Sequence, residues 1–399
     1  MTTQDPNFQR FSDQEYQRRY AAVRKEMTAR GIDALVAVGD SGGRTANQAN
    51  IYWLTNWIDP MVSYVVMTTT GGPWLIVSNQ LFLHTALHAG HASEIKACTG
   101  MNPGPEIAAR LSDAGLANGR VGIAGVRNIG RASMPSEHLD TLKKALPKAE
   151  FVDALEVLMH PRMIKSAEEI EWFERGAAWT DRVIEHLARE IRIGMPEYQL
   201  SALIHEAVLP LGGGVRLQFV GATPMSAPEI IFPWQYPSNR PLQRGDVLLT
   251  EISASYGNCS GQIQRPFAIG AAPTPEYQRL FDHAADCYQR IFEVLKPGTT
   301  DVEVRAAAGF IERAGYKTLD VLLHGWGMQI EPPRVDLPSA MIKRELGPVT
   351  FQENMLIVIQ PHVVTADGQR GLQTGGLVVI EKNGARALQK YPMEFIRVA

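Results

Sequence analysis

The chain has 399 residues, more than one ordinary hydrophobic core accommodates, which predicts two domains. Its 39 basic and 42 acidic residues give a net charge of −3, so nucleic acid is not an expected partner. Residues 1–19 lack the apolar core of a signal peptide, and no apolar run of membrane-spanning length follows. A cytoplasmic protein with no membrane partner is therefore expected.

Helices and strands are predicted to alternate over the first part of the chain. Residues 12–31 carry apolar side chains at helical spacing, and Gly31 stands where a C-terminal cap belongs. Strand-like runs follow at residues 32–38, 62–68, 74–77 and 121–124, and helical stretches at 106–114 and 134–145. This alternation is typical of an α/β domain, which we expect over residues 1–160.

A helix start near residue 166 marks the expected domain boundary. Ser166 followed by Glu169 forms a capping box and predicts a long helix. Further helices are predicted at 198–211, 275–295 and 302–314, and strands at 247–253, 261–269, 355–359 and 377–381. The second domain is expected over residues 161–399.

Four segments of this second domain place polar groups beside apolar strands. They are residues 244–251, which end in Glu251, 261–267 with Gln262 and Gln264, 324–327 with His324 and Trp326, and 358–362 with Gln360 and His362. An unpaired buried polar group costs about 1–3 kcal/mol. These groups therefore either satisfy one another in a structural network or form an active site.

The order of these segments resembles the pita-bread superfamily of methionine aminopeptidase, aminopeptidase P, prolidase and creatinase. Matching stretches, in the order of that superfamily, are residues 163–170, 237–246, 296–298, 324–327 and 371–384. The resemblance implies an α/β chain in which an N-terminal creatinase-like α/β domain precedes a C-terminal pita-bread α+β domain.

The resemblance also identifies the positions at which the metallopeptidases bind two divalent ions. Their two Asp, one His and two Glu correspond here to Glu251, Gln262, His324, Gln360 and Gly375. Two such ions carry a charge of +4 and need anionic oxygen ligands. The sequence therefore predicts no metal and no cofactor, and resembles a metal-free branch of the creatinase or ectoine hydrolase kind.

The catalytic residues of creatinase are also replaced. Its substrate-facing Glu positions correspond to Gln264 and Gln360, and its two further histidines correspond to Trp234 and Glu331. The arginine of its N-terminal domain has no counterpart in residues 57–64. Creatine is therefore not an expected substrate.

The main hypothesis from the sequence is a metal-independent hydrolase that cleaves a C–N bond of a small polar molecule, of amide, amidine or lactam type. Glu251 is predicted to be the base or nucleophile, and His324 the acid/base group. The residues predicted to bind substrate are polar or aromatic: Gln262, Gln264, Gln360, Trp234, Trp326, Glu331, His362, Gln373, Tyr64 and Trp57.

Two alternatives stay open. One is a non-catalytic pseudo-peptidase that binds a small molecule or peptide. The other is a single-metal, Xaa-Pro peptidase-like hydrolase that uses His324, Glu251 and Glu331. The resemblance further implies a homodimer in which the N-terminal domain completes the pocket of the partner. Candidate lining residues from that domain are Arg44, Tyr52, Trp53, Trp57 and Tyr64.

Overall fold

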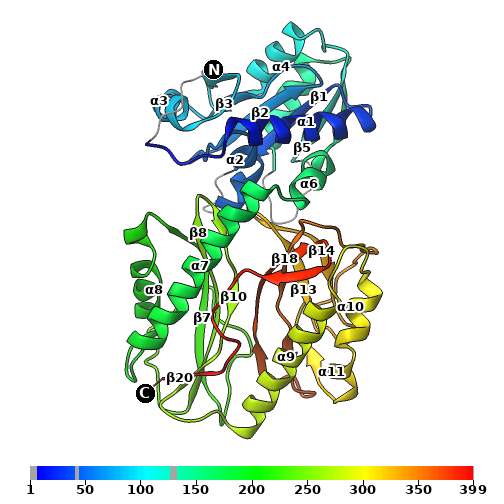
Figure 1. Ribbon diagram of the computed structural model, residues 1–399. Coiled ribbons are helices and arrows are strands. Elements are labelled where there is room, and N and C mark those ends of the chain that lie inside the picture. The colour runs from blue at the N-terminus through cyan, green and yellow to red at the C-terminus, as the bar shows by residue number, and fades with distance from the viewer. Residues whose placement is uncertain (1–6, 41–44, 126–132, 399) are drawn as a thin grey trace. The chain divides into compact units, whose positions relative to one another are not determined.

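The computed structural model describes residues 7–40, 45–125 and 133–398, so Arg44 lies outside the described residues (Figure 1). The chain divides into two compact units, Met1–Arg162 and Met163–Ala399. Within the described ranges, no helix is both long enough and apolar enough to span a membrane.

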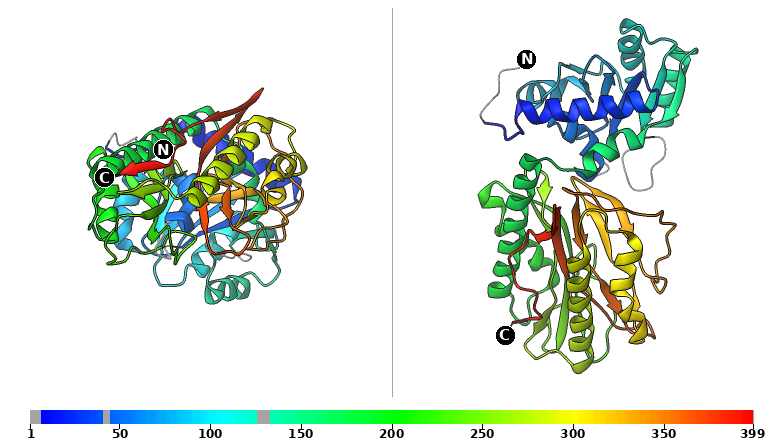
Figure 2. Two further views of the ribbon diagram at one scale, coloured as in Figure 1. Left: turned by 90° about the horizontal axis from the view of Figure 1, so that it is seen from below. Right: turned by 45° about the vertical axis from the view of Figure 1, so that its right-hand side comes forward.

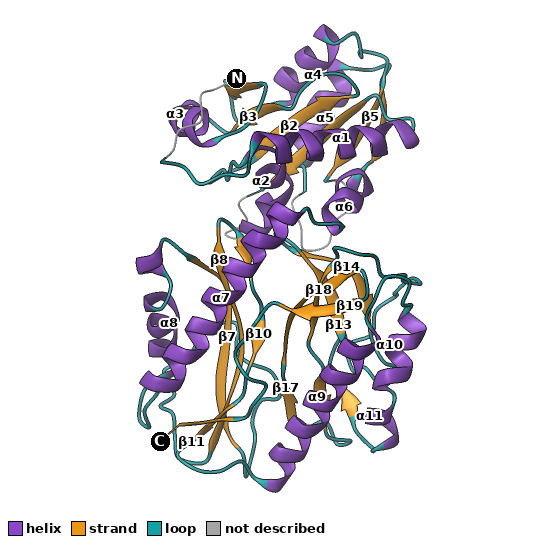
Figure 3. Ribbon diagram, viewed as in Figure 1, coloured by secondary structure: helices purple, strands orange, loops and turns teal. Residues whose placement is uncertain are grey.

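The first unit is a mixed six-stranded sheet with strand order β4-β3-β2-β1-β5-β6 and helices on both faces (Figure 3). Its strands are β1 (Ala34–Gly39), β2 (Ser63–Thr68), β3 (Trp74–Val77), β4 (Glu94–Ala97), β5 (Arg120–Ala124) and β6 (Glu150–Asp153). Its helices are α1 (Asp13–Ala29), η1 (Thr45–Gln48), α2 (Ala49–Thr55), α3 (Gln80–Ala89), α4 (Gly104–Asp113), α5 (Ser136–Ala145) and α6 (Leu155–Met163).

The central strand β1 explains this layering. Every residue of β1 is buried, and a strand buried on both faces needs cover on both sides. Helix α1 begins after Ser12, whose side chain accepts the N–H of Glu15. Gly31 has φ = 61°, a left-handed conformation that lets the chain turn from α1 toward β1.

The second unit is built on an eleven-stranded sheet. Its helices are α7 (Ala167–Glu190), α8 (Glu197–Glu206), η2 (Leu209–Leu211), α9 (Pro275–Val294), α10 (Asp301–Ala308) and α11 (Phe310–Arg313). Its strands are β7 (Gly214–Pro224), β8 (Asp246–Tyr256), β9 (Cys259–Ser260), β10 (Ile263–Gln264), β11 (Phe267–Ile269), β12 (Lys317–Thr318), β13 (Leu323–Trp326), β14 (Ile330–Val335), β15 (Leu356–Ile359), β16 (His362–Val364), β17 (Gly371–Gln373), β18 (Gly375–Glu381), β19 (Gly384–Ala387) and β20 (Ile396–Val398).

Two hydrophobic cores hold this unit together. One packs α7 and α8 against β7, β8, β11 and β20, and the other packs α9 and α10 against β13, β15 and β18. Figure 2 shows the two pairs of helices flanking the strands. The sheet runs in the order β14-β13-β15-β18-β10-β8-β11-β20, and β12, β16 and β17 form a small sheet of their own.

Most predicted elements are present, with local differences. The capping box at Ser166 and Glu169 is confirmed at the start of α7. The helix predicted at 302–314 is divided at Gly309 into α10 and α11. The strand predicted at 261–269 is interrupted at residues 265–266, where proline removes a donor from the ladder. The α/β domain followed by a pita-bread α+β domain is confirmed.

Arg265 connects the C-terminal segment around residues 391–392 to the large sheet through hydrogen bonds. It is only 3% exposed. Among the described residues, its guanidinium donates only to main-chain carbonyl oxygens. The acceptors are those of Gln264 (2.8 Å), Gly375 (2.7 Å), Tyr391 (3.0 Å) and Pro392 (2.7 Å). The five rigid N–H donors of arginine suit such a set, and no other side chain replaces all of them.

Replacing Arg265 by Met should lower the free energy of unfolding by about 2–4 kcal/mol, because buried carbonyls lose their donors. The matched control is Arg386→Met, which removes a half-exposed guanidinium that pairs with Glu174 and Glu381. That change should cost about 1 kcal/mol or less. Urea unfolding of both variants measures the difference, and equal losses would contradict this account of Arg265.

Candidate active site

Strands of both halves of the second unit bring the predicted polar residues together. Glu251 lies in the middle of β8, in a run of ten buried residues. Phe219 of β7 is its register partner, so both side chains lie on one face of the sheet. On the small sheet, His362 of β16 is paired with Gln373 of β17.

The Glu251 carboxyl group is held by two glutamine amides. Gln262 Nε2 donates to Oε1 of Glu251, and Gln373 Nε2 donates to Oε2 at 3.2 Å. Burial raises the pKa of Glu251 to about 7, against the lowering effect of these two hydrogen bonds. Glu251 is therefore poised to exchange a proton near neutral pH.

His324 of β13 is a neutral imidazole at that pH. Burial lowers its pKa to about 4. Its Nδ1 lies 3.0 Å from the carbonyl oxygen of Gly325. Because a carbonyl only accepts, Nδ1 carries the proton and Nε2 is an acceptor. Arg334 of β14 is the cross-strand partner of His324, so its guanidinium lies on the same face.

These groups surround one pocket of about 180 Å³. Of the residues predicted from the sequence, it is lined by Glu251, His324, Gln360, His362 and Gln373. Burial also lowers the pKa of His362 to about 4, so the pocket holds two neutral histidines. The predicted residues thus converge in part on a single concave polar site.

Two predicted glutamines lie behind the lining. Gln262 supports Glu251, and Gln264 Nε2 donates to Gln360 Oε1 at 2.9 Å. The remaining oxygens, Gln262 Oε1 and Gln264 Oε1, are buried and accept no hydrogen bond from the described residues. Gln262 and Gln264 therefore hold the lining side chains Glu251 and Gln360 in place without lining the pocket themselves.

Three other predicted residues do not line the pocket. Trp326 is buried, donates to the Ser260 carbonyl and stacks against Arg216. Trp234 is 43% exposed and stands outside the pocket lining. Glu331 accepts from Lys165 Nζ at 2.7 Å in a buried ion pair. Their predicted contact with substrate finds no support in this pocket.

The aromatic residues predicted from the N-terminal domain are buried inside the first unit. Tyr64 is completely buried and is hydrogen-bonded to His138. Trp57 donates from Nε1 to Asp59 Oδ2 at 3.0 Å. Tyr52 and Trp53 are also buried in helix α2. These side chains leave little surface for contact with a substrate.

Seven lining residues were not predicted: Phe219, Phe232, Asp320, Val321, Ile330, Arg334 and Arg344. Phe219 belongs to β7, a strand that the sequence analysis missed. Arg334 stands an even number of residues after Ile330 in β14, and period-2 spacing was the available signal. Asp320 and Arg344 form an ion pair from irregular segments, which carry no such pattern.

A six-stranded α/β unit followed by a pita-bread unit with a polar pocket defines a two-domain chain of the creatinase and prolidase type. Metallopeptidase family M24 matches residues 171–382, and the Creatinase/Prolidase N-terminal domain matches residues 19–164. The chain belongs to metallopeptidase family M24.

Similar proteins include an Xaa-Pro dipeptidase from Pyrococcus horikoshii, 25% identical over 69% of this chain and 76% of that protein. A creatinase from a Bacillus species is 23% identical over 71% of this chain and 69% of that protein. The X-Pro aminopeptidase structure from Thermotoga maritima superposes with a TM-score of 0.79 at 19% identity, covering 95% of this chain and 99% of that chain. This last likeness shows the fold alone.

These findings correct the main functional hypothesis. A metal-independent hydrolase of a small polar molecule, from an ectoine hydrolase-like branch, is wrong. The chain belongs to a metallopeptidase family, and similar proteins are named Xaa-Pro dipeptidases. Membership in the creatinase and prolidase superfamily, predicted from the same motifs, is confirmed.

The residues present do not fit the two divalent ions that the family implies. Both Glu251 oxygens accept amide N–H groups, and the Gln360 oxygen accepts from Gln264. Gly375 has no side chain, and a Cβ there would collide with the Ile359 carbonyl oxygen. One carboxyl group and neutral amides cannot offset a charge of +4.

The ligand set predicted for a single ion also fails to form. Glu331 is engaged by Lys165 and does not join Glu251 and His324. In the parts of the chain that the structure describes, no three His, Cys, Asp or Glu side chains are grouped so that they could hold a metal ion.

The raised pKa of Glu251 predicts a pH-dependent loss of stability. Its ordinary value is 4.5 and its value in the folded chain is about 7, so the stabilising contribution is complete below pH 4.5 and lost as pH rises through 7. The wild type should lose up to about 3 kcal/mol relative to Glu251→Gln over this range.

Urea unfolding of both proteins from pH 4.5 to 8 measures this difference. His324 and His362 have lowered pKa values, so their contribution is lost as pH falls toward 4, the opposite direction. Both proteins retain these histidines, and comparing the two cancels that effect. Parallel pH profiles would show that Glu251 has an ordinary pKa.

Proposed function

We propose that this chain hydrolyses the C–N bond of a short peptide that carries a free carboxylate, in the pocket around Glu251 and His324. Membership in family M24 and the likeness to Xaa-Pro dipeptidases support a peptide substrate. The observation that carries the proposal is the guanidinium of Arg334 beside the two predicted reacting groups.

Arg334 lies in the pocket without a fixed anionic partner. Among the described residues, it makes no hydrogen bond or ion pair, whereas the neighbouring Arg344 is paired with Asp320. Burial removes water from the guanidinium and lowers the pKa of Arg334. A bound anion would therefore stabilise the charged form of this side chain. A guanidinium binds a carboxylate through two parallel hydrogen bonds, which fixes the orientation of that group.

The dimensions of the pocket favour a small peptide. Its volume is about 180 Å³. An apolar cavity of about 150 Å³ already holds benzene, so this pocket encloses a group somewhat larger than one six-membered ring. The rings of Phe219 and Phe232 supply an apolar wall suited to such a group. One side chain or ring of a dipeptide meets these limits.

Glu251 supplies the proton exchange that hydrolysis needs. With a pKa of about 7, it takes a proton from the attacking water and returns it to the leaving amine. His324 Nε2 accepts a hydrogen bond and orients the water or the substrate N–H. The C–N bond breaks, and the products are an amine and a carboxylic acid.

The test is the release of amino acids from free dipeptides, including Xaa-Pro dipeptides. Purified wild type should show turnover, and Glu251→Gln should reduce kcat by about 10²–10⁴-fold because the proton acceptor is lost. The assays are run with added Mn²⁺, with added Zn²⁺ and with a chelator, so that turnover is detected whether or not it needs a divalent ion. No turnover of any dipeptide in all three conditions would contradict the proposal.

The role of Arg334 has its own test. Arg334→Gln should raise KM for a free dipeptide by about 10–100-fold, because a charge-assisted hydrogen-bonded pair is lost. The C-terminal amide of the same dipeptide carries no carboxylate, so its KM should change little. An equal rise in KM for both substrates would show that Arg334 does not bind the carboxylate.

A second candidate is peptide binding without turnover. Amides stand at the positions of metal-binding carboxylates, and this observation favours a pseudo-peptidase. It predicts that a dipeptide raises Tm through mass action while remaining intact. Calorimetric titration combined with product analysis separates the two functions.

We also propose a homodimer in the cytoplasm. The Creatinase/Prolidase N-terminal domain match supports the first part of this proposal, since the creatinase-like branch is dimeric by resemblance. Light scattering coupled to size-exclusion chromatography tests the mass, and a monomer at all concentrations would contradict it.

A further inference from the structure

Two exposed histidines lie side by side on helix α3 of the first unit (Figure 1). His84 and His88 are four residues apart, which places them on one face of the helix. The opposite face buries Ala86 and Ala89, so both imidazole side chains are accessible to solvent. The proposed hydrolysis uses neither of these two histidines.

The separation of the two rings fits a metal ion bound by both. The centroids of His84 and His88 are 4.9 Å apart, and the ring planes are tilted by 41°. A transition-metal ion lies about 2.0–2.1 Å from an imidazole nitrogen, and therefore about 3.2 Å from the centroid of that ring. Two rings that bind one ion at an angle of about 90–110° thus have centroids about 4.5–5.2 Å apart. The observed separation falls within this range.

Helix α3 holds the pair in this arrangement because both of its ends are capped. Asn79 Oδ1 accepts the N–H of Leu81 at 2.8 Å, and the N–H of Gly90 donates to the Ala86 carbonyl oxygen at 2.8 Å. His88 lies in the last turn, where the negative end of the helix dipole favours a cation. The helix therefore both positions the two imidazoles and favours a positive ion beside them.

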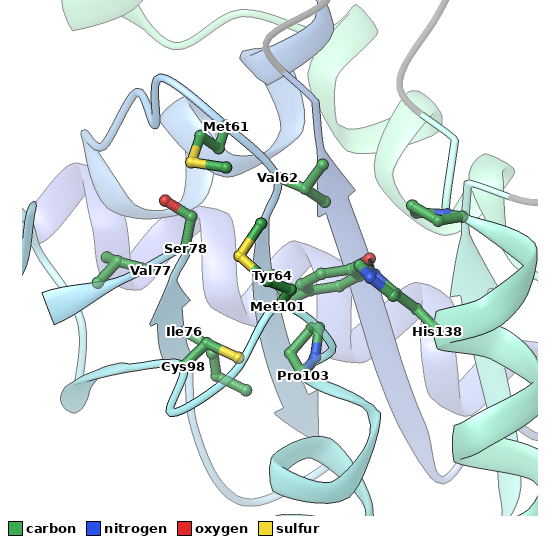
Figure 4. A pocket seen from close by; sticks show the side chains of 11 residues that line it. Met61, Val62, Tyr64, Ile76, Val77, Ser78, Cys98, Met101, Pro103 and His138 are labelled. Carbon is green, nitrogen blue, oxygen red and sulfur yellow. Dashed lines mark hydrogen bonds between the residues drawn. The ribbon is translucent and has the colours of Figure 1, made fainter.

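Two further histidines of the first unit are engaged by tyrosines. His91 Nδ1 lies 2.7 Å from the hydroxyl oxygen of Tyr20. His138 is buried, and its Nδ1 lies 2.7 Å from the hydroxyl oxygen of Tyr64 in the cavity shown in Figure 4. Within the described residues, no third His, Cys, Asp or Glu joins the pair on α3 to complete a ligand set. Two imidazoles are thus the protein ligands that this surface offers.

We propose that His84 and His88 form a surface site for one divalent transition-metal ion, with water in the remaining coordination positions. Imidazole nitrogens suit Cu²⁺, Ni²⁺ and Zn²⁺, whereas Mg²⁺ and Ca²⁺ need oxygen ligands. Among these ions, nitrogen ligands generally bind Cu²⁺ most tightly, so Cu²⁺ is the ion that this site favours. The residues of the site are separate from those around Glu251.

Calorimetric titration of the full chain with Cu²⁺ tests the site, at pH 7.5 with glycine present to keep the ion soluble. His84→Ala and His88→Ala should each weaken the binding by at least about 10-fold, because loss of a group that only orients a ligand already costs about 10–100-fold. Mg²⁺ should show no binding at this site. Absence of Cu²⁺ binding by the wild type, or equal affinity in the wild type and both variants, would overturn the proposal.

A second variant keeps the number of imidazoles and changes only their spacing. His88→Ala combined with Thr85→His places the two rings on adjacent residues, which do not face each other on a helix, and should bind Cu²⁺ as weakly as His88→Ala alone. His160→Ala removes another exposed histidine of the first unit, beside Glu156, and should leave the affinity unchanged. All these positions are exposed, so loss of folding is a small risk. Wild-type affinity in the spacing variant would overturn the assignment.

Discussion

The hydrogen-bonded carboxyl group of Glu251 is the constraint on which the rest of the pocket depends. A buried carboxylate needs partners, and here two glutamine amides from separate segments supply them. Gln262 precedes β10 and Gln373 ends β17, so the acid is joined to both the large and the small sheet. The arrangement stabilises the local fold and leaves Glu251 able to change its protonation state.

The same amides explain why the residues of this chain do not fit the two-ion ligand set of its family. An amide N–H that points at a carboxylate oxygen takes one of its electron pairs and turns a positive end toward the place where a cation would lie. In the same way, the Gln264 amide donates to the Gln360 oxygen and takes an electron pair of that second former ligand position. Reintroducing one carboxylate would therefore not restore a metal site, since each glutamine is oriented by its neighbour and Gly375 leaves no room for a side chain.

The sequence was sufficient to predict groups that depend on family motifs and local pattern. The capping box of α7, the strand that bears Glu251 and the nearby His324 are of this kind. The sequence was insufficient where the pairing of distant strands decides which side chains enter the pocket. Arg334 enters the pocket only because β14 pairs with β13 in one register, and Phe219 only because β7 pairs with β8. Glu331 stands at the position of a creatinase histidine, yet Lys165, far away in the chain, determines its environment.

The charges of the pocket connect substrate binding with the protonation of Glu251. Asp320 and Arg344 neutralise each other, His324 and His362 are neutral near pH 7, and Arg334 remains positive. Below pH 7, protonation of Glu251 leaves the pocket with a net positive charge, which favours an anionic ligand. A bound carboxylate cancels the charge of Arg334 and, as a second negative charge, raises the pKa of Glu251 further. Binding thus makes Glu251 a stronger base toward the proton that it takes from the attacking water and later returns to the leaving amine.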